Sequence, residues 1–251
     1  MNWNIVKGAC LALLPVAGTL KAQEKPNIVV ILADDLASNE ISCYGGKNLK
    51  TPNIDRIAEE GIRFTNNFAS CAMSVPIRAS LYTGLYPARH GSYQNHKISY
   101  SDIKSVTYYL PQAGYRVGRA GKTHTVPKSV FNFEKVPGFE ENCIAVTADY
   151  TVDGIRDFMR QDSPFCLFVC STLSHAPWTC GNKDEFDADK VILPPNCVDN
   201  KGTRELFRRL LAEIRALDNQ VGDVLKTIEE VGKLDNTCLL YTSPSPRDRT
   251  R

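Results

Sequence analysis

Residues 27–35 read NIVVILADD, and this stretch decides the fold class. The run from Asn27 to Leu32 is short, continuous and apolar after its first residue, which is typical of a strand buried on both faces of a parallel sheet. Asp34 and Asp35 follow at its carboxyl end, where open α/β sheets bind their ligands. Adjacent aspartates are also common in turns and caps, so their meaning depends on the rest of the chain.

Strand and helix signals alternate after this stretch, which predicts an α/β fold with a mostly parallel sheet and helices on both faces. Residues 165–171 form a second apolar run and predict another central strand, and residues 116–120 predict a weaker third. Thr51 as N-cap and Gly61 as stop predict a short helix between them.

The longest helical signal lies late in the chain, where apolar residues recur at spacings of three and four. The stripe consists of Leu206, Leu210, Ile214, Leu217, Val221, Val224, Ile228 and Val231. This pattern predicts a packing helix. Asp218 and Asn219 within it have the chemistry of metal ligands, but beside such a stripe they are expected to be solvated.

Composition excludes several classes of function. The 251 residues are 43% hydrophobic and 23% charged, which is ordinary for a globular protein. Because 30 basic residues are balanced by 28 acidic ones, no nucleic-acid partner is expected. The longest apolar stretch, residues 9–20, is too short for a membrane span, which takes about 20 residues.

Both ends are expected to lie outside the fold. Lys7, the apolar run after it and Ala22 have the layout of a secretory signal over residues 1–22, which predicts an exported, periplasmic or secreted protein. Residues 238–251 begin CLLYTSPSPRD and resemble the translation of a transposase-based sequencing adapter, which predicts a non-native tail. A natural Pro-rich tail is the alternative. In either case, proline-rich sequence is not expected to supply a central strand.

Seven cysteines remain between these ends, and an odd number in an exported protein leaves at least one free thiol. Cys180 and Cys197 flank a polar loop and could pair. Cys166 and Cys170 lie in an apolar run and are expected in the core.

Residues 74–84 read SVPIRASLYTG. Ser74 is expected just before a short helix that starts near Pro76, where unpaired N–H groups and the helix dipole favour an anion. Arg78, one turn later, offers a fixed cation to the same place. Alternatively, Ser74 is only an N-cap and Arg78 a surface residue.

Three segments together resemble the motifs of the type I, formylglycine-dependent sulfatases, in the family's order. They are KPNIVVILADD at 25–35, SVPIRASLYTG at 74–84 and GKTH at 121–124. The resemblance implies an alkaline-phosphatase-like α/β fold, of which residues 23–237 are the N-terminal part of a catalytic domain truncated on its C-terminal side. Segments such as PWTCG at 177–181 look closest to heparan N-sulfatase relatives, which implies a sulfated glycan substrate.

The resemblance also implies cofactors and a partner. Ser74 would be oxidised to formylglycine by a radical-based maturase that works without oxygen, which suggests an anaerobic bacterium. Asp34, Asp35 and Ser74 would hold a calcium ion, with Mg²⁺ possible. The remaining acidic ligands of the family come after residues 234–237, so the chain as written is expected to be inactive. A sheet that lacks the strand carrying them would expose unpaired backbone and apolar surface, so the chain is also expected to be poorly soluble.

Two further motifs supply candidate catalytic residues. GKTH at 121–124 is not a phosphate-binding P-loop, because Arg116 stands where that loop needs a glycine. By resemblance, Lys122 neutralises a sulfate oxygen and His124 contacts the formylglycine hydrate. His175 follows a predicted strand and resembles the family histidine that contacts sulfate and protonates the leaving group. His90 is expected to be structural, and His96 to reach the substrate.

These residues predict a sulfuric ester hydrolase that cleaves sulfate esters or sulfamates, with Ser74, Arg78, Lys122, His124 and His175 as its catalytic set. One alternative is a phosphoesterase of the alkaline phosphatase superfamily that uses unmodified Ser74. Another is a glycan-binding relative without catalytic activity.

Overall fold

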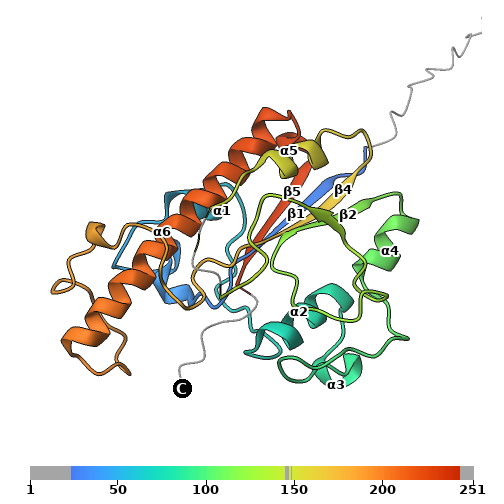
Figure 1. Cartoon of the computed structure of the whole chain (residues 1–251). Coiled ribbons are helices and arrows are strands. Elements are labelled where there is room, and N and C mark those ends of the chain that lie inside the picture. Colours follow the sequence, from blue (N-terminus) through green and yellow to red (C-terminus); the bar gives the residue numbers. More distant parts are fainter. Residues whose placement is uncertain (1–23, 145–146, 148, 244–251) are drawn as a thin grey trace, which may run out of the picture.

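β1 (Asn27–Leu32) lies inside a five-stranded sheet with the order β3-β2-β4-β1-β5 and only parallel pairs (Figure 1). The other strands are β2 (Arg116–Gly121), β3 (Glu134–Val136), β4 (Phe165–Cys170) and β5 (Thr237–Thr242). This computed structural model describes residues 24–243 except 145, 146 and 148. The predicted parallel α/β sheet is confirmed, whereas the predicted signal peptide, residues 1–22, lies outside the described residues.

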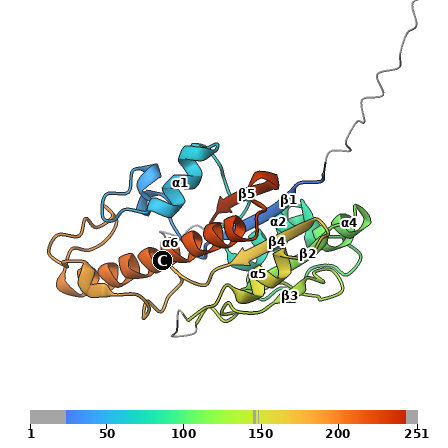
Figure 2. The same ribbon diagram turned by 90° about the horizontal axis from the view of Figure 1, so that it is seen from above.

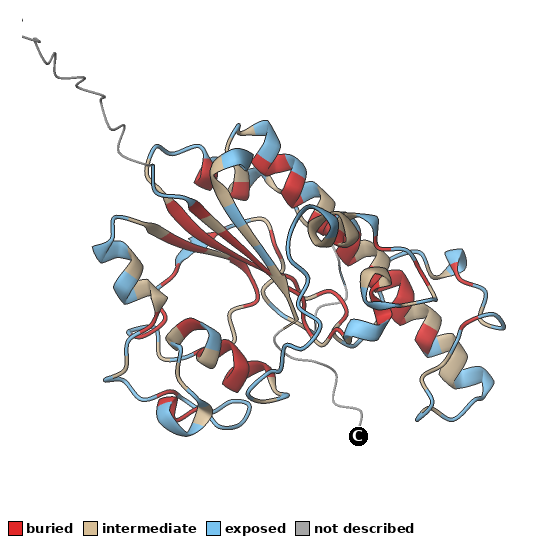
Figure 3. Cartoon of the chain, turned by 180° about the vertical axis from the view of Figure 1, so that it is seen from behind, coloured by how far each residue is buried: buried red, intermediate tan, exposed pale blue. Residues whose placement is uncertain are grey.

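Helices cover both faces of the sheet (Figure 2). They are α1 (Pro52–Glu60), α2 (Ser74–Thr83), α3 (Pro87–His90), α4 (Val106–Gln112), α5 (Asp153–Met159) and α6 (Lys201–Glu230). Short 3-10 turns occupy Ser38–Glu40, Ser42–Tyr44, Lys183–Glu185 and Leu234–Asn236. Val29 and Ile31 of β1 join the apolar cluster of α1, α5 and α6, while Val30 and Leu32 join that of α2. The central strands β1 and β4 are therefore buried on both sides (Figure 3).

α6 is the predicted packing helix. Its 30 residues correspond to roughly 45 Å at the usual helical rise. Six of the eight predicted stripe positions are buried: Leu210, Ile214, Leu217, Val221, Val224 and Ile228. Leu206, by contrast, is 52% exposed, and Phe207 packs into the core in its place.

The prediction that Asp218 is solvated is wrong, because its side chain is fully buried. Its carboxylate accepts hydrogen bonds from the Ile54 backbone N–H at 2.9 Å and from the Asn53 backbone N–H at 3.3 Å and side-chain amide at 3.0 Å. Thr51 is the N-cap of α1, as predicted, but makes no capping side-chain bond. Asp218 thus caps α1 from α6. The two helices pass so closely that a Cβ at Gly222 would lie 2.6 Å from Asn53.

We expect Asp218→Ala to lower the free energy of unfolding by about 1–3 kcal/mol, because the buried N–H groups of α1 lose their acceptor. Urea denaturation monitored by circular dichroism measures this. Asp102→Ala removes an exposed carboxylate and serves as the control. Equal midpoints for the two variants would refute the capping role.

β5 corrects the prediction that the sequence after Asn236 leaves the sheet without a further strand, although β5 lies at the edge of the sheet and is not a central strand. Residues 237–242 pair with β1 along its whole length, and Leu239 and Tyr241 pack on the core. The prediction was wrong because the prolines begin only at residue 244, after a run of strand-forming residues. The adapter resemblance of residues 238–251 stays a prediction.

The described cysteines are all free thiols, so the suggested pairing of Cys180 with Cys197 is wrong. Cys166 and Cys170 are buried in β4, as predicted. Within the described part of the chain, no helix combines the length and apolar character needed to cross a bilayer.

Candidate functional site

The carboxyl ends of three neighbouring strands bring the predicted site residues to one edge of the sheet. Asp34 follows β1, Lys122 follows β2 and His175 follows β4, while Ser74 is the first residue of α2. Because parallel strands end at the same edge, residues far apart in the sequence meet there.

Asp34 is the centre of this group. The Ser74 hydroxyl donates a hydrogen bond to its Oδ1 at 3.0 Å, and Arg78 Nη2 lies 3.3 Å from the same oxygen. Lys122 forms an ion pair with Oδ2, and its Nζ is 3.3 Å from Ser74 Oγ. All four side chains are buried. The structure therefore brings Asp34, Ser74, Arg78 and Lys122 together, as predicted, and rules out Arg78 as a surface residue.

The electrostatics of this group favour an anion. Burial alone raises the pKa of Asp34, but Arg78 and then Lys122 more than offset this and hold the pKa below its ordinary value. Two buried cations then face one carboxylate around Ser74. The excess positive charge is shielded from water, where a bound anion interacts with it most strongly.

Ser74 owes its position to the start of α2. The N-cap is Met73, in an extended conformation and without a side-chain capping bond, so Ser74 is not the N-cap of this helix. The backbone N–H of Val75 donates to Asn95 Oδ1 at 3.0 Å. Asn95 was not predicted, because nothing in the sequence pattern shows that its loop returns to α2.

Lys122 is positioned by a close approach between β2 and β4. Gly121 has a φ of +83°, and a Cβ there would lie 2.2 Å from the carbonyl oxygen of Cys170. The Lys122 N–H donates to that same oxygen at 2.9 Å. Only glycine fits at position 121, which gives the GKTH motif a structural reason for its first residue.

His124 lies beside this group with a strongly altered pKa. Burial, followed by the charges of Lys122 and Arg78, lowers the pKa of His124 to about 4. The imidazole is therefore neutral at pH 7, and its Nδ1 is buried without a hydrogen-bond partner among the described residues. The His96 ring packs against it at a centroid distance of 5.5 Å.

This pKa predicts acid sensitivity. Between pH 6.5 and pH 4 the unfolded chain binds a proton at His124 that the folded chain does not, so stability falls as the pH falls through this window. We expect the wild type to lose more stability than His124→Gln between pH 7 and pH 4.5. Urea midpoints at the two pH values measure the difference. The same loss in both proteins would show that His124 does not titrate in this way.

His175 stands at the rim of the group, with its Nε2 3.7 Å from Asp35 Oδ2. The preceding residue, Ser174, donates a hydrogen bond from its hydroxyl to the carbonyl oxygen of Asp34 at 2.7 Å. This bond joins the loop after β4 to the loop after β1. Ser174 was not predicted as a site residue, because a lone serine beside a strand carries no pattern.

Glu213 of α6 binds the backbone of the loop that carries His175, a few residues after the histidine. Its side chain is 2% exposed, and Oε1 accepts hydrogen bonds from the backbone N–H groups of Thr179 at 2.8 Å and Cys180 at 3.0 Å. Burial raises its pKa despite these bonds. Glu213 therefore fixes the loop that carries His175, a role hidden in the sequence because helical glutamates usually face water.

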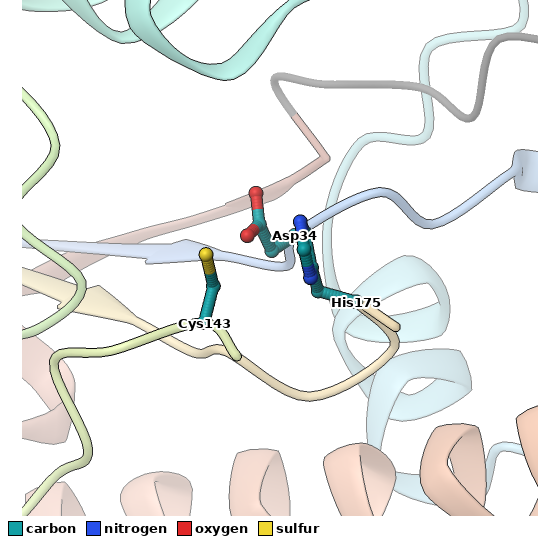
Figure 4. Close-up of side chains that lie close together, drawn as sticks. All are labelled: Asp34, Cys143 and His175. Atoms are coloured by element: carbon teal, nitrogen blue, oxygen red, sulfur yellow. The ribbon is translucent and has the colours of Figure 1, made fainter. Parts of the chain in front are cut away.

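The donor atoms at this edge fit a hard cation in part. Asp34, Asp35 and Ser74 offer carboxylate and hydroxyl oxygens, which Ca²⁺ and Mg²⁺ prefer. The structure also places Cys143 near Asp34 and His175, with one ligand atom of each within 4.8 Å of the others (Figure 4). Sulfur and imidazole suit softer ions. A calcium site would therefore rest on the oxygen set, and Asp34, Asp35 and Ser74 as its ligands stay predictions.

A family model described as Sulfatase matches residues 26–243. The chain belongs to the sulfatase family. Its relatives include an ulvan-active sulfatase of Formosa agariphila, with 34% identity over 88% of this chain and 44% of that protein. The human N-sulphoglucosamine sulphohydrolase is 28% identical over 96% of this chain and 55% of that protein. The sulfatase-family chain thus spans about half the length of these relatives.

The solved structures that resemble this chain include the phosphonate monoester hydrolase of Agrobacterium radiobacter. The TM-score is 0.73 at 19% identity, over 88% of this chain and 62% of that one. Such a likeness concerns the fold alone. Together with the family match, it confirms the alkaline-phosphatase-like α/β fold expected from the motifs of this sulfatase-family chain.

Proposed function

We propose that this chain is part of an exported enzyme that hydrolyses sulfate esters or sulfamates of sulfated glycans. The observation that carries the proposal is the buried arrangement of Arg78, Lys122 and Asp34 around Ser74 at the start of α2. A sulfate group is an anion that fits such a place, and family membership makes sulfate the preferred one.

Arg78 and Lys122 are the sulfate-binding residues in this proposal. Both side chains are 2% exposed or less, and both pair with the Asp34 carboxylate. Negative charge grows on the sulfate oxygens and the leaving atom as the bond to sulfur breaks. Fixed cations in a water-poor site stabilise that charge without having to reorganise, which is usually the largest contribution to catalysis.

Ser74 is the proposed precursor of formylglycine, whose hydrated aldehyde supplies the attacking oxygen when present. Asp34 accepts the hydrogen bond of the Ser74 hydroxyl, so it fixes the direction of the oxygen that side chain carries. His124 is neutral at pH 7, so its imidazole would be able to accept a hydrogen bond from the hydrated group at position 74. His175 at the rim is the proposed proton donor to the leaving group.

Asp34 and Asp35, with the oxygen at Ser74, are the proposed ligands of a calcium ion. The ion would offset the negative charge that two carboxylates and a sulfate group bring to the same place. A radical-based maturase is the proposed partner of Ser74. The names of the relatives, an ulvan-active sulfatase and a sulphohydrolase of sulphoglucosamine, support a sulfated carbohydrate as substrate.

A phosphoesterase that uses unmodified Ser74 is the second candidate, favoured by the fold that the chain shares with a phosphonate monoester hydrolase. The two candidates differ in substrate and in the state of Ser74. A glycan-binding protein without catalytic activity would bind the sulfated glycan but release neither sulfate nor phosphate.

Turnover tests these candidates. The full-length protein, co-expressed with a radical maturase and supplied with calcium, is assayed with N-sulfoglucosamine, glucosamine 6-sulfate and 4-nitrophenyl phosphate. We expect sulfate release that Ser74→Ala abolishes. Phosphate release by a protein with intact Ser74, and no sulfate release, would favour the phosphoesterase.

A further inference from the structure

The segment between α3 and α4 forms a closed loop with an exposed tip. Residues 93–98 are all exposed, whereas Ser92 and Ser99 on either side are buried. The Ser92 and Ser99 hydroxyls hydrogen-bond each other at 2.7 Å, and the Ser99 N–H donates to the Val126 carbonyl at 3.0 Å. The loop is therefore fastened at its base to the chain just after the GKTH motif. We call residues 93–98 the rim loop.

The rim loop forms part of the wall of the site. Asn95 accepts a hydrogen bond from the N–H of Val75, the residue after Ser74. The next residue, His96, packs its ring 5.5 Å from that of His124, and its φ of +64° is a conformation that non-glycine residues rarely adopt. The hydrogen bond of Asn95 and the ring contact of His96 thus hold an exposed histidine beside the partly buried His124, which is an ordered arrangement.

The tip carries side chains suited to an anionic sugar. Tyr93 is 56% exposed and Ile98 is 65% exposed, although both are apolar enough to be buried. Lys97 is exposed and lies with its Nζ 5.7 Å from the centroid of the Tyr93 ring. An exposed aromatic ring offers a face to the apolar side of a sugar, and an ammonium group binds carboxylate or sulfate.

We propose that the rim loop recognises two adjacent sugars of the glycan. His96 contacts the sugar that carries the reactive sulfate group, and Lys97 with Tyr93 binds an anionic group on the adjacent sugar. The substrate is then an anionic chain of at least two sugars, rather than a small aryl sulfate. This inference rests on the proposed function, because it assumes that sulfate binds at Arg78 and Lys122.

Calorimetric binding to the full-length protein, expressed without a maturase, tests the inference, with three probes: inorganic sulfate, N-sulfoglucosamine and a heparin tetrasaccharide. We expect Lys97→Ala to weaken tetrasaccharide binding about tenfold, the loss of one charge-assisted contact, and to leave the other two probes unchanged. His96→Ala should weaken both sugars but not inorganic sulfate. The residues are exposed, so thermal midpoints should match the wild type.

Lys104→Ala is the matched control. Lys104 is also paired with a tyrosine, at 4.8 Å from the Tyr108 ring, but it lies outside the rim loop. Equal tetrasaccharide affinities for the Lys97 and Lys104 variants would overturn the inference, as would a wild type that binds the tetrasaccharide no better than inorganic sulfate. A wild type that binds none of the three probes would refute the proposed function itself, and the inference with it.

Discussion

Replacing Arg78 with alanine is expected to lower sulfate release by about a hundredfold to a thousandfold in the matured full-length protein, as loss of a fixed charge-stabilising group typically does. Arg78 is fully buried and 3.3 Å from Asp34, so water cannot replace its charge at the sulfate group. Arg78→Lys keeps the charge but loses the planar fork, and should retain part of the activity. The value of kcat/KM for N-sulfoglucosamine measures both effects.

Arg89→Ala is the control for this prediction, because Arg89 is an exposed arginine on the neighbouring helix α3. It should leave kcat/KM within about twofold of the wild type, as expected for a surface change. Near-normal turnover by Arg78→Ala would remove Arg78 from the site and with it the proposed sulfate-binding pair.

Replacing Asp34 with alanine is expected to cost both stability and activity. Arg78 and Lys122 would remain buried without their carboxylate, and breaking a buried ion pair typically costs about 3–5 kcal/mol. Urea unfolding in the presence of a chelator measures this loss without any contribution from calcium. Calcium titration of the folded variant, at low temperature, should show no binding.

Asp35→Ala separates the loss of calcium binding from the loss of stability. The Asp35 side chain is 34% exposed, so its removal leaves no buried charge unpaired. We expect the variant to lose calcium affinity while its urea midpoint stays close to that of the wild type. An Asp34 variant as stable as the Asp35 variant would contradict the central place given to Asp34.

The sequence predicts those site residues that directly follow a strand or start a helix. Asp34, Lys122 and His175 all come after apolar strand runs, and parallel strands bring such positions together. Their positions follow from these local patterns, whereas their catalytic roles follow from the resemblance to the sulfatase motifs.

The residues that support them could not be predicted in this way. Asn95, Ser174 and Glu213 act through backbone groups of segments that are distant in sequence, and no periodicity records those contacts. The prediction that Asp218 is solvated was wrong for a related reason. Helical spacing shows which neighbours a residue has on its own helix, but not that a second helix places its N-terminus against it.

The most direct test of a formylglycine at position 74 is the mass of the tryptic peptide that ends at Arg78 and contains Ser74, taken from the chain after anaerobic co-expression with a radical maturase. We expect a peptide that has lost two hydrogen atoms, with fragment ions that place the change at Ser74 and not at Ser70 of the same peptide. A peptide whose Ser74 is unmodified after co-expression, while a sulfatase known to be matured carries the aldehyde under the same conditions, would contradict this expectation.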